Sequence, residues 1–146
     1  HDIYATDGNV DLEIGDISFS IECPLISMNE VLSSCDVVSL HIPAQSDGSA
    51  VIGKEQLDQM KPGALLINAA RGGVLDEDAL ISALNSGHLG GAALDVFVGE
   101  PSPRADVLSH PRLSLTPHTG AATGEAQDRI GLELASQIAE VEKARA

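Results

Sequence analysis

Apolar runs typical of strands alternate with helix-like segments along most of the chain, and this alternation constrains the fold more than any other feature. Parallel strands need a crossover of a dozen or more residues between them, and that crossover is usually a helix. The spacing therefore predicts βαβ units and the α/β fold class, with a parallel sheet. The expected strands are residues 35–43, 64–69, 90–97 and 112–117, and the expected helices are residues 27–34, 53–63, 76–87 and 123–145.

Local signals predict where several of these elements begin and end. Ser27 and Glu30 have the spacing of a capping box, Asp76 is the expected N-cap of the third helix, and Gly87 is expected to adopt a left-handed conformation after it. The first two strands are continuous apolar runs and are expected to be buried on both faces. Residues 1–16 mix Gly and Asp with scattered apolar residues and are expected to form a loop. The last helix is expected to place Ile130, Leu134, Ile138 and Val141 on one face.

Length, charge and cysteine usage narrow the class of protein. The chain has 146 residues, which suits one globular unit, and its formal net charge is −14. No basic stripe is present to bind nucleic acid phosphates, and the acidity argues equally against an anionic membrane surface. Cys23 and Cys35 match neither a zinc motif nor a disulfide framework, so a cytoplasmic protein with reduced thiols and no metal is expected. A solvated acidic surface is the simplest explanation of the charge, and adaptation to high salt is the alternative.

Chemically reactive side chains follow the expected strands, at the edge where an open parallel sheet binds its ligands. His41 follows the first strand, Arg71 the second, Asp95 the third and His118 the fourth, and Glu100 lies in the loop after Asp95. Each residue alone has a simpler explanation: Arg71 could form a surface ion pair, Asp95 could cap its loop, and His118 could be a capping or core histidine. Their shared position at one edge favours a catalytic site.

The residue types suit acid–base chemistry on a hydroxy acid. Arg71 lies in "ARGG", where two glycines let the backbone approach a ligand, and its guanidinium can hold a carboxylate through two parallel hydrogen bonds. His118, with Glu100 behind it, can move a proton on a hydroxyl next to that carboxylate. Oxidation of such an alcohol needs a hydride acceptor. Since the sequence has no metal-ligand cluster and no flavin signature, a nicotinamide is the economical choice.

Three segments resemble consecutive signatures of the D-isomer-specific 2-hydroxyacid dehydrogenases: "ALLINAARGGVLDEDAL", "GAALDVFVGEP" and "LTPHTGAATGEAQDR". They occur in the family's order and at near-normal spacing, and the resemblance covers roughly residues 29–146. It implies a Rossmann-like, doubly wound parallel sheet, of which residues 1–146 are the C-terminal portion of the NAD-binding domain. The phosphate loop, with the first strand and helix, is then expected upstream of His1, together with most of the substrate domain.

The resemblance also implies a role for each site residue. Arg71 would bind the substrate carboxylate and carbonyl oxygen, His118 would be the general acid and base, and Glu100 would be its carboxylate partner. Asp95 would face the nicotinamide carboxamide, and Asp2 would hydrogen-bond the adenosine ribose, which favours NAD over NADP. The implied cofactor-binding residues are Asp2, His41, Ile42, Pro43, Ala69, Ala70, Arg71, Asp95, His118 and Gly120.

Within the family, "GAATGEAQDR" is most similar to D-3-phosphoglycerate dehydrogenases, so the expected reaction is oxidation of 3-phosphoglycerate to 3-phosphohydroxypyruvate in serine biosynthesis. The alternatives are a hydroxypyruvate or glyoxylate reductase and a non-catalytic, NAD(H)-sensing, corepressor-like scaffold. Where relatives often have "TPET", this chain reads "AQSDGS", so Ser46 or Ser49 would replace a threonine contact to the cofactor. The expected partners are a small-molecule substrate and a second copy of the chain, in a homodimer formed through this domain.

Overall fold

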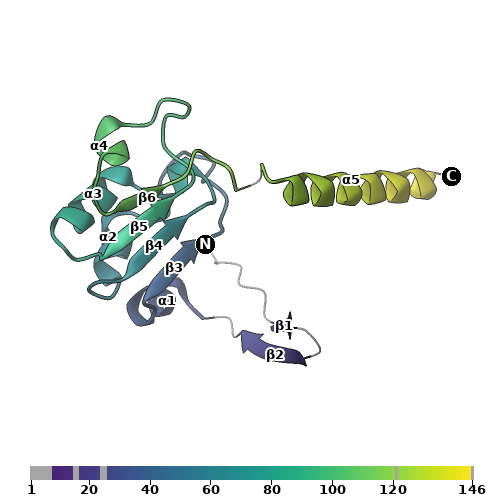
Figure 1. The fold of residues 1–146 in the computed structure, drawn as a ribbon, viewed down its shortest axis with the longest axis horizontal. Helices are drawn as coiled ribbons and strands as arrows, with labels where there is room; N and C mark the ends of the chain where they lie inside the picture. The colour runs from purple at the N-terminus through teal and green to yellow at the C-terminus, as the bar shows by residue number, and fades with distance from the viewer. Residues whose placement is uncertain (1–7, 15–16, 24–25, 121, 146) are drawn as a thin grey trace.

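The computed structural model describes residues 8–14, 17–23, 26–120 and 122–145 (Figure 1). Its strands are β1 (Gly8–Ile14), β2 (Ile17–Cys23), β3 (Val37–Leu40), β4 (Leu65–Asn68), β5 (Gly91–Leu94) and β6 (Leu113–Leu115). Its helices are α1 (Met28–Ser34), α2 (Lys54–Gln59), the 3-10 turn η1 (Gly72–Val74), α3 (Glu77–Asn85), α4 (Ala105–Leu108) and α5 (Gly124–Arg145).

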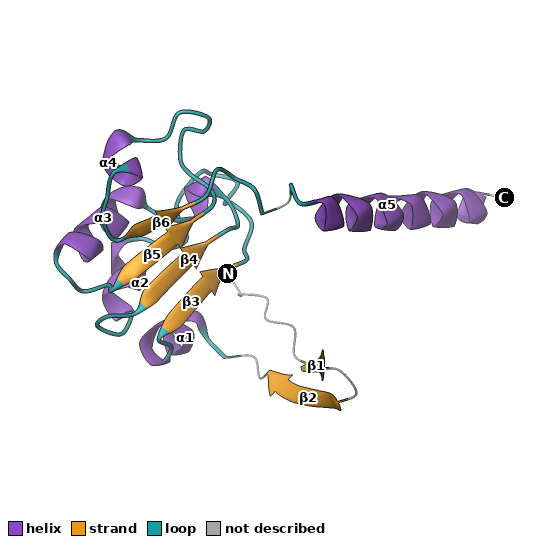
Figure 2. Cartoon of the chain, viewed as in Figure 1, coloured by secondary structure: helices purple, strands orange, loops and turns teal. Residues whose placement is uncertain are grey.

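The centre of the molecule is a parallel sheet with the strand order β3-β4-β5-β6 (Figure 2). Helix α2 lies in the connection from β3 to β4, and α3 lies in the connection from β4 to β5. This arrangement confirms the α/β class and the parallel sheet that the alternation of strands and helices predicts, and the Rossmann-like fold that the family resemblance implies. The short helix α4 and the turn η1 were not expected from the sequence.

The predicted N-caps begin helices α1 and α3. At the start of α1, the Glu30 N–H donates to Ser27 Oγ at 3.3 Å. At the start of α3, Asp76 Oδ1 accepts from the N–H groups of Asp78 at 2.9 Å and Ala79 at 3.0 Å. Gly87 follows α3 with a φ of 77°, a conformation that a side chain would strain. These residues therefore determine where α1 and α3 begin and where the chain leaves α3 for the next strand.

The core lies on one face of the sheet. Burial alternates along β3, where Val38 and Leu40 are buried, and it alternates in the same sense along β4. The prediction that these strands are buried on both faces is wrong for the described residues: Val37 is 51% exposed and Leu65 is 45% exposed. The reason is that the helices pack against one face only, so the second apolar face has no cover. The core residues contributed by α1, α2 and α3 are Leu32, Leu57, Leu80, Ala83 and Leu84.

An antiparallel hairpin replaces part of the loop that the sequence led us to expect over residues 1–16. Strand β1 pairs with β2, and the Cα partners include Val10 with Ile21 and Leu12 with Phe19. Apolar and polar residues alternate along "NVDLEI" and again along "ISFSIE", which is the period of a half-buried strand. The glycines and aspartates that flank this alternation masked it in the sequence.

Helix α5 confirms the last predicted helix and projects away from the sheet in Figure 1. Its large apolar side chains are all more than half exposed, so its expected apolar face packs against nothing in the described part of the chain. None of the described helices combines the length and apolarity needed to cross a bilayer. The residues that form this exposed face are Ile130, Leu134, Ile138 and Val141.

Candidate active site

The predicted site residues collect at the carboxyl edge of the sheet. Because the four strands are parallel, the segments that follow each of them begin at the same edge. These segments start at His41 after β3, Ala69 after β4, Asp95 after β5 and Thr116 after β6. The topology therefore places the arginine, the histidines and the acids of the sequence prediction along one side of the sheet.

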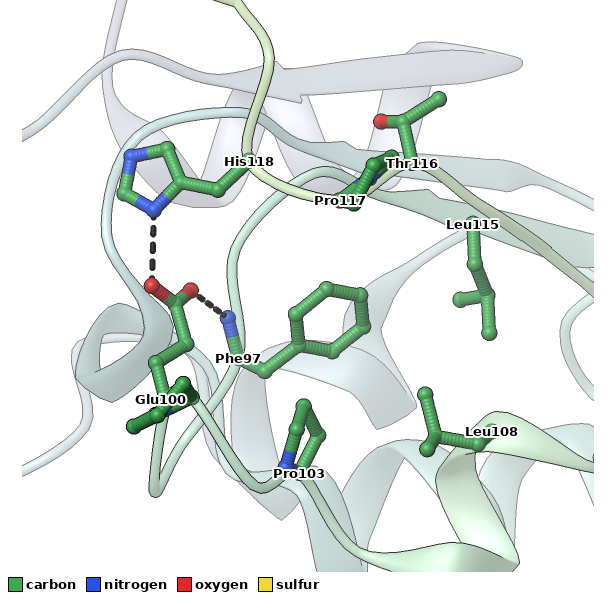
Figure 3. Close-up of a pocket in the computed structure, with 9 residues that line it drawn as sticks. Phe97, Glu100, Pro103, Leu108, Leu115, Thr116, Pro117 and His118 are labelled. Carbon is green, nitrogen blue, oxygen red and sulfur yellow. Dashed lines mark hydrogen bonds and ion pairs between the residues drawn. The ribbon is translucent and has the colours of Figure 1, made fainter.

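His118 and Glu100 form the pair that the sequence predicted. His118 Nδ1 lies 2.7 Å from Glu100 Oε2, and the second carboxylate oxygen, Oε1, accepts a hydrogen bond from the Phe97 N–H at 2.8 Å (Figure 3). The hydrogen bond from His118, followed by that from Phe97, holds the pKa of Glu100 below its usual range. Glu100 is thus an anionic acceptor that orients the ring, and Nε2 has no hydrogen-bond partner among the described residues.

Asp95 organises the turn that carries His118. Its Oδ1 accepts from Thr116 Oγ1 at 2.6 Å and from the Thr119 N–H at 2.8 Å, and its Oδ2 accepts from the Gly120 N–H at 2.8 Å. His118 itself has a φ of 54°, in the left-handed region that non-glycine residues seldom adopt. A Cβ on Gly120 would lie 2.9 Å from Asp95 Oδ2, so this contact leaves no room for a side chain. The structure therefore gives Asp95 the loop-capping role, and its expected contact with the nicotinamide stays a prediction.

The hydrogen bonds to Asp95 predict how stability depends on pH. Burial raises the pKa of Asp95, but the hydrogen bonds from Thr116, Thr119 and Gly120 outweigh it, so the pKa is lowered overall. A carboxyl group whose pKa is lower in the folded than in the unfolded protein stabilises the fold at pH values above its unfolded-state pKa. This stabilisation is lost as the pH falls through its folded-state pKa. The free energy of unfolding of Asp95→Asn should therefore differ most from that of the wild type near neutral pH, and the difference should shrink below about pH 4.

Denaturant unfolding of both proteins at neutral and acidic pH measures this difference. If the difference in the free energy of unfolding between the two proteins stays constant or widens as pH falls, the ionised form of Asp95 does not stabilise the turn. A matched control is Asp58→Asn, because the exposed Asp58 bonds only to Lys54 within its own helix among the described residues.

Arg71 lies in a backbone segment fixed by a buried asparagine. Asn68, at the end of β4, is 1% exposed, its Oδ1 accepts from the Ala70 N–H at 3.1 Å, and its Nδ2 donates to the Arg71 carbonyl at 3.1 Å. The exposed Arg71 guanidinium donates to the Ala70 carbonyl at 2.6 Å, and no carboxylate of the described residues forms an ion pair with it. Its charge is therefore available to an acidic ligand, and the surface ion pair considered from the sequence is not formed with any described residue.

Six of the predicted cofactor residues line one hollow at the ends of β3 and β4. The hollow has a volume of about 440 Å³ and is formed by the turn after β3 and the segment after β4. Apart from His41 and Arg71, its walls are small or apolar side chains, so backbone groups are accessible to a flat ligand. An open hollow with accessible backbone groups and the cationic Arg71 is suited to binding part of a dinucleotide. The lining residues are His41, Ile42, Pro43, Ala44, Ala69, Ala70 and Arg71.

The His118–Glu100 pair borders a second hollow, of about 540 Å³, whose other walls are apolar except for Thr116 (Figure 3). Phe97, Leu108 and Leu115 line it together with prolines, and it shares no lining residue with the first hollow. The His118–Glu100 pair and the hollow after β3 and β4 thus both lie at the carboxyl edge of the sheet. Asp2, the predicted ribose ligand, lies outside the described residues. No group of acids, histidines and cysteines able to hold a metal ion occurs among the described residues.

Two polar residues of this edge were not singled out by sequence reasoning. Asn68 holds the backbone at Ala70 and Arg71. Glu77, in the first turn of α3, is 5% exposed and accepts from the Val98 N–H at 2.8 Å. For Asn68 the sequence did carry a signal, because a polar residue stands there at the end of an apolar strand. Glu77 gave no comparable signal, since acids are common in the first turn of any helix.

Comparisons with known proteins show the family that this chain is similar to. Residues 10–120 match the family model described as D-isomer specific 2-hydroxyacid dehydrogenase, NAD binding domain. The chain is 41% identical over 121 residues to a D-3-phosphoglycerate dehydrogenase of Synechocystis and 46% identical over 116 residues to that of Escherichia coli. The crystal structure of a glyoxylate reductase from Paecilomyes thermophila matches with a TM-score of 0.67 at 38% identity.

These matches cover most of this chain but a minor part of each relative. They span 83% and 76% of this chain, and 22% and 28% of the Synechocystis and Escherichia coli proteins. The glyoxylate reductase match covers 73% of this chain and 33% of that structure. The cofactor expected from the sequence, NAD, is the one for which the matching domain family is described. The chain belongs to the NAD-binding domain family of the D-isomer-specific 2-hydroxyacid dehydrogenases.

Proposed function

We propose that these residues belong to an NAD-dependent oxidoreductase that interconverts a D-2-hydroxy acid and the corresponding 2-oxo acid. One observation carries the proposal: His118 Nδ1 is held on an anionic Glu100, which leaves Nε2 open for proton transfer. When bound, the nicotinamide supplies the acceptor or donor of the hydride. The family to which the chain belongs and the free charge of Arg71 support the same assignment.

His118 has the geometry of a general acid and base. With its Nδ1 side facing Glu100, the neutral ring carries its proton on Nδ1 and offers the lone pair of Nε2 to a hydroxyl. During oxidation, Nε2 accepts the hydroxyl proton, and the carboxylate of Glu100 stabilises the resulting imidazolium. During reduction of the 2-oxo acid, the imidazolium returns that proton to the carbonyl oxygen.

Arg71 has the chemistry to hold the substrate. Its planar guanidinium can donate two parallel hydrogen bonds to the carboxylate next to the reacting carbon. The bonds of Asn68 to Ala70 and Arg71 fix the backbone from which the side chain extends. Such fixation orients the substrate before reaction, and orientation accounts for a large part of enzymatic rate enhancement.

The substrate proposed is 3-phosphoglycerate, oxidised to 3-phosphohydroxypyruvate as in serine biosynthesis. The support is the 41% and 46% identity to D-3-phosphoglycerate dehydrogenases, together with the "GEAQDR" stretch that follows His118. A second candidate is reduction of glyoxylate or hydroxypyruvate, which the similarity to a glyoxylate reductase structure favours. Both candidates use the same proton transfer and differ only in the far end of the substrate.

The test is NADH oxidation by the full natural polypeptide that contains these residues, with 3-phosphohydroxypyruvate, hydroxypyruvate, glyoxylate and 2-oxoglutarate as substrates. We expect the highest kcat/KM with 3-phosphohydroxypyruvate. Activity on the unphosphorylated acids alone would keep the mechanism and replace the first candidate with the second. Binding of NADH without turnover of any of the four acids would overturn the enzymatic proposal and favour the sensing scaffold.

A further inference from the structure

The loop that carries Glu100 is attached to the first turn of α3 at both of its ends. Near its start, the Val98 N–H donates to Glu77 Oε1 at 2.8 Å. Near its end, Arg104 Nη1 bonds to Asp78 Oδ1 at 2.5 Å. Glu77 and Asp78 are consecutive residues, so one helix terminus holds the two ends of the segment that presents the catalytic carboxylate.

The two attachments differ in burial. Arg104 and Asp78 have side chains that are 42% and 79% exposed, and ion pairs at such positions contribute little to rigidity or stability. Glu77 is 5% exposed, and its second oxygen, Oε2, is buried without a hydrogen-bond partner in the described part of the chain. A buried carboxylate with an unpaired oxygen is unfavourable by itself. The bond to Val98 gives this buried carboxylate a structural task in the loop that carries Glu100.

The same backbone segment is in direct contact with the arginine segment. A Cβ built on Gly72 would lie 2.0 Å from the Phe97 carbonyl oxygen and 2.8 Å from the Val98 nitrogen. Only glycine permits this approach, so the residue after Arg71 packs directly on the backbone before Glu100. The segment that carries Arg71 is therefore in close backbone contact with the segment that carries Glu100, at Phe97 and Val98.

A chain of hydrogen bonds leads from Glu77 to the catalytic histidine. Two consecutive N–H groups donate to two different glutamates: Val98 to Glu77, and Phe97 to Glu100. Glu100 in turn accepts from His118 Nδ1. If Val98 is released, the backbone at Phe97 loses one of the contacts that fix it, and the bond from the Phe97 N–H to the carboxylate that orients His118 is weakened.

We propose that Glu77 is a positioning residue of the active site, which holds the Phe97–Val98 backbone so that Glu100 meets His118 Nδ1. This inference rests on the proposed proton transfer by His118. Glu77 touches neither His118 nor Glu100 in the contacts described, so its effect is transmitted through the backbone.

The test compares Glu77→Leu with Glu77→Gln in the full natural polypeptide. Leucine removes the acceptor for the Val98 N–H, whereas the oxygen of glutamine keeps it. We expect Glu77→Leu to lower kcat by about 10- to 100-fold, because small displacements of catalytic groups have effects of this size, with the Kd for NADH unchanged. Glu77→Gln should stay within about threefold of the wild type, since its amide oxygen can still accept the hydrogen bond from the Val98 N–H.

A second measurement reports on His118 without requiring turnover. In protein labelled with ¹⁵N at histidine, the neutral His118 ring should be the Nδ1–H tautomer in the wild type and in Glu77→Gln. In Glu77→Leu, the Nε2–H tautomer should increase. The His118 signals are assigned by their loss in His118→Asn. Should Glu77→Leu not accumulate as folded protein, Glu77→Asp replaces it, because the shorter side chain withdraws the acceptor from Val98 while it keeps the charge.

The matched control is Leu84→Ala, a core residue of the same helix that is 1% exposed. It should lower the melting temperature and leave both kcat and the tautomer unchanged below that temperature. Unchanged kcat and tautomer in Glu77→Leu and Glu77→Asp would overturn the proposal, as would a loss in Glu77→Gln as large as that in Glu77→Leu. If the wild type turns over no 2-oxo acid, the proposed function fails, while the tautomer measurement still decides whether Glu77 positions the pair.

Discussion

Replacing His118 by alanine is expected to lower kcat for reduction of the 2-oxo acid by about 10²- to 10⁴-fold, the usual contribution of a positioned general acid or base. The substitution removes the Nε2 that the Glu100 contact at Nδ1 leaves open for the substrate. The Kd for NADH should change little, since the predicted cofactor hollow is lined by other residues, after β3 and β4. Steady-state kinetics and NADH titration of the full natural polypeptide separate the two quantities.

The contact between His118 and Glu100 allows a second test, of whether the two residues act as one unit. Glu100→Gln should lower kcat by itself, and the double variant should be no slower than His118→Ala alone, because residues that act as a unit are not additive. His110→Ala is the control, since His110 bonds to Asn85 and to its own turn near the opposite ends of the strands. Turnover by His118→Ala at the wild-type rate would rule out the assigned acid and base.

Replacing Arg71 by glutamine is expected to lower kcat/KM for the 2-oxo acid by about 10²- to 10⁴-fold, which corresponds to about 3–5 kcal/mol of lost transition-state stabilisation. Arg71 is the only cation lining the hollow beside the site, apart from any charge on His41, and no acid of the described residues neutralises it. Arg71→Lys should recover only part of the loss, because an ammonium group cannot donate the two parallel hydrogen bonds of a guanidinium.

Kinetics with varied 2-oxo acid at saturating NADH measure this effect. Arg112→Gln is a suitable control: Arg112 donates to the carbonyls of Leu84 and Leu89, and lies before β6 at the opposite edge from Arg71. If Arg71→Gln and Arg71→Lys both keep the wild-type kcat/KM, a residue other than Arg71 binds the substrate carboxylate.

The elements that position the site were predictable because their signals are local. The caps Ser27 and Asp76 and the left-handed Gly87 follow from short-range chemistry and lie where expected. Once the strands were placed and assumed parallel, the shared edge of Arg71 and His118 followed from topology alone. The pairing of His118 with Glu100 likewise follows the family resemblance.

The remaining features depend on contacts that no local pattern encodes. Glu77 meets Val98 across 21 positions of the sequence, and Gly72 meets Phe97 only after β4 and β5 have paired. Asp95 caps a turn whose donors lie 21 to 25 positions further along the chain. Burial on one face rather than two depends on which elements cover the sheet, which apolar runs in the strands alone do not specify.

The most direct test of the central claim follows the hydride itself. The full natural polypeptide is incubated with NADH that carries deuterium at the transferable position and with 3-phosphohydroxypyruvate or glyoxylate, and the product is analysed by NMR and mass spectrometry. We expect one deuterium on the carbon next to the carboxylate, with the D configuration where that carbon is a stereocentre, and a large loss of this label in His118→Ala. Saturation with NADH without transfer of deuterium to either acid would rule out hydride transfer to C2.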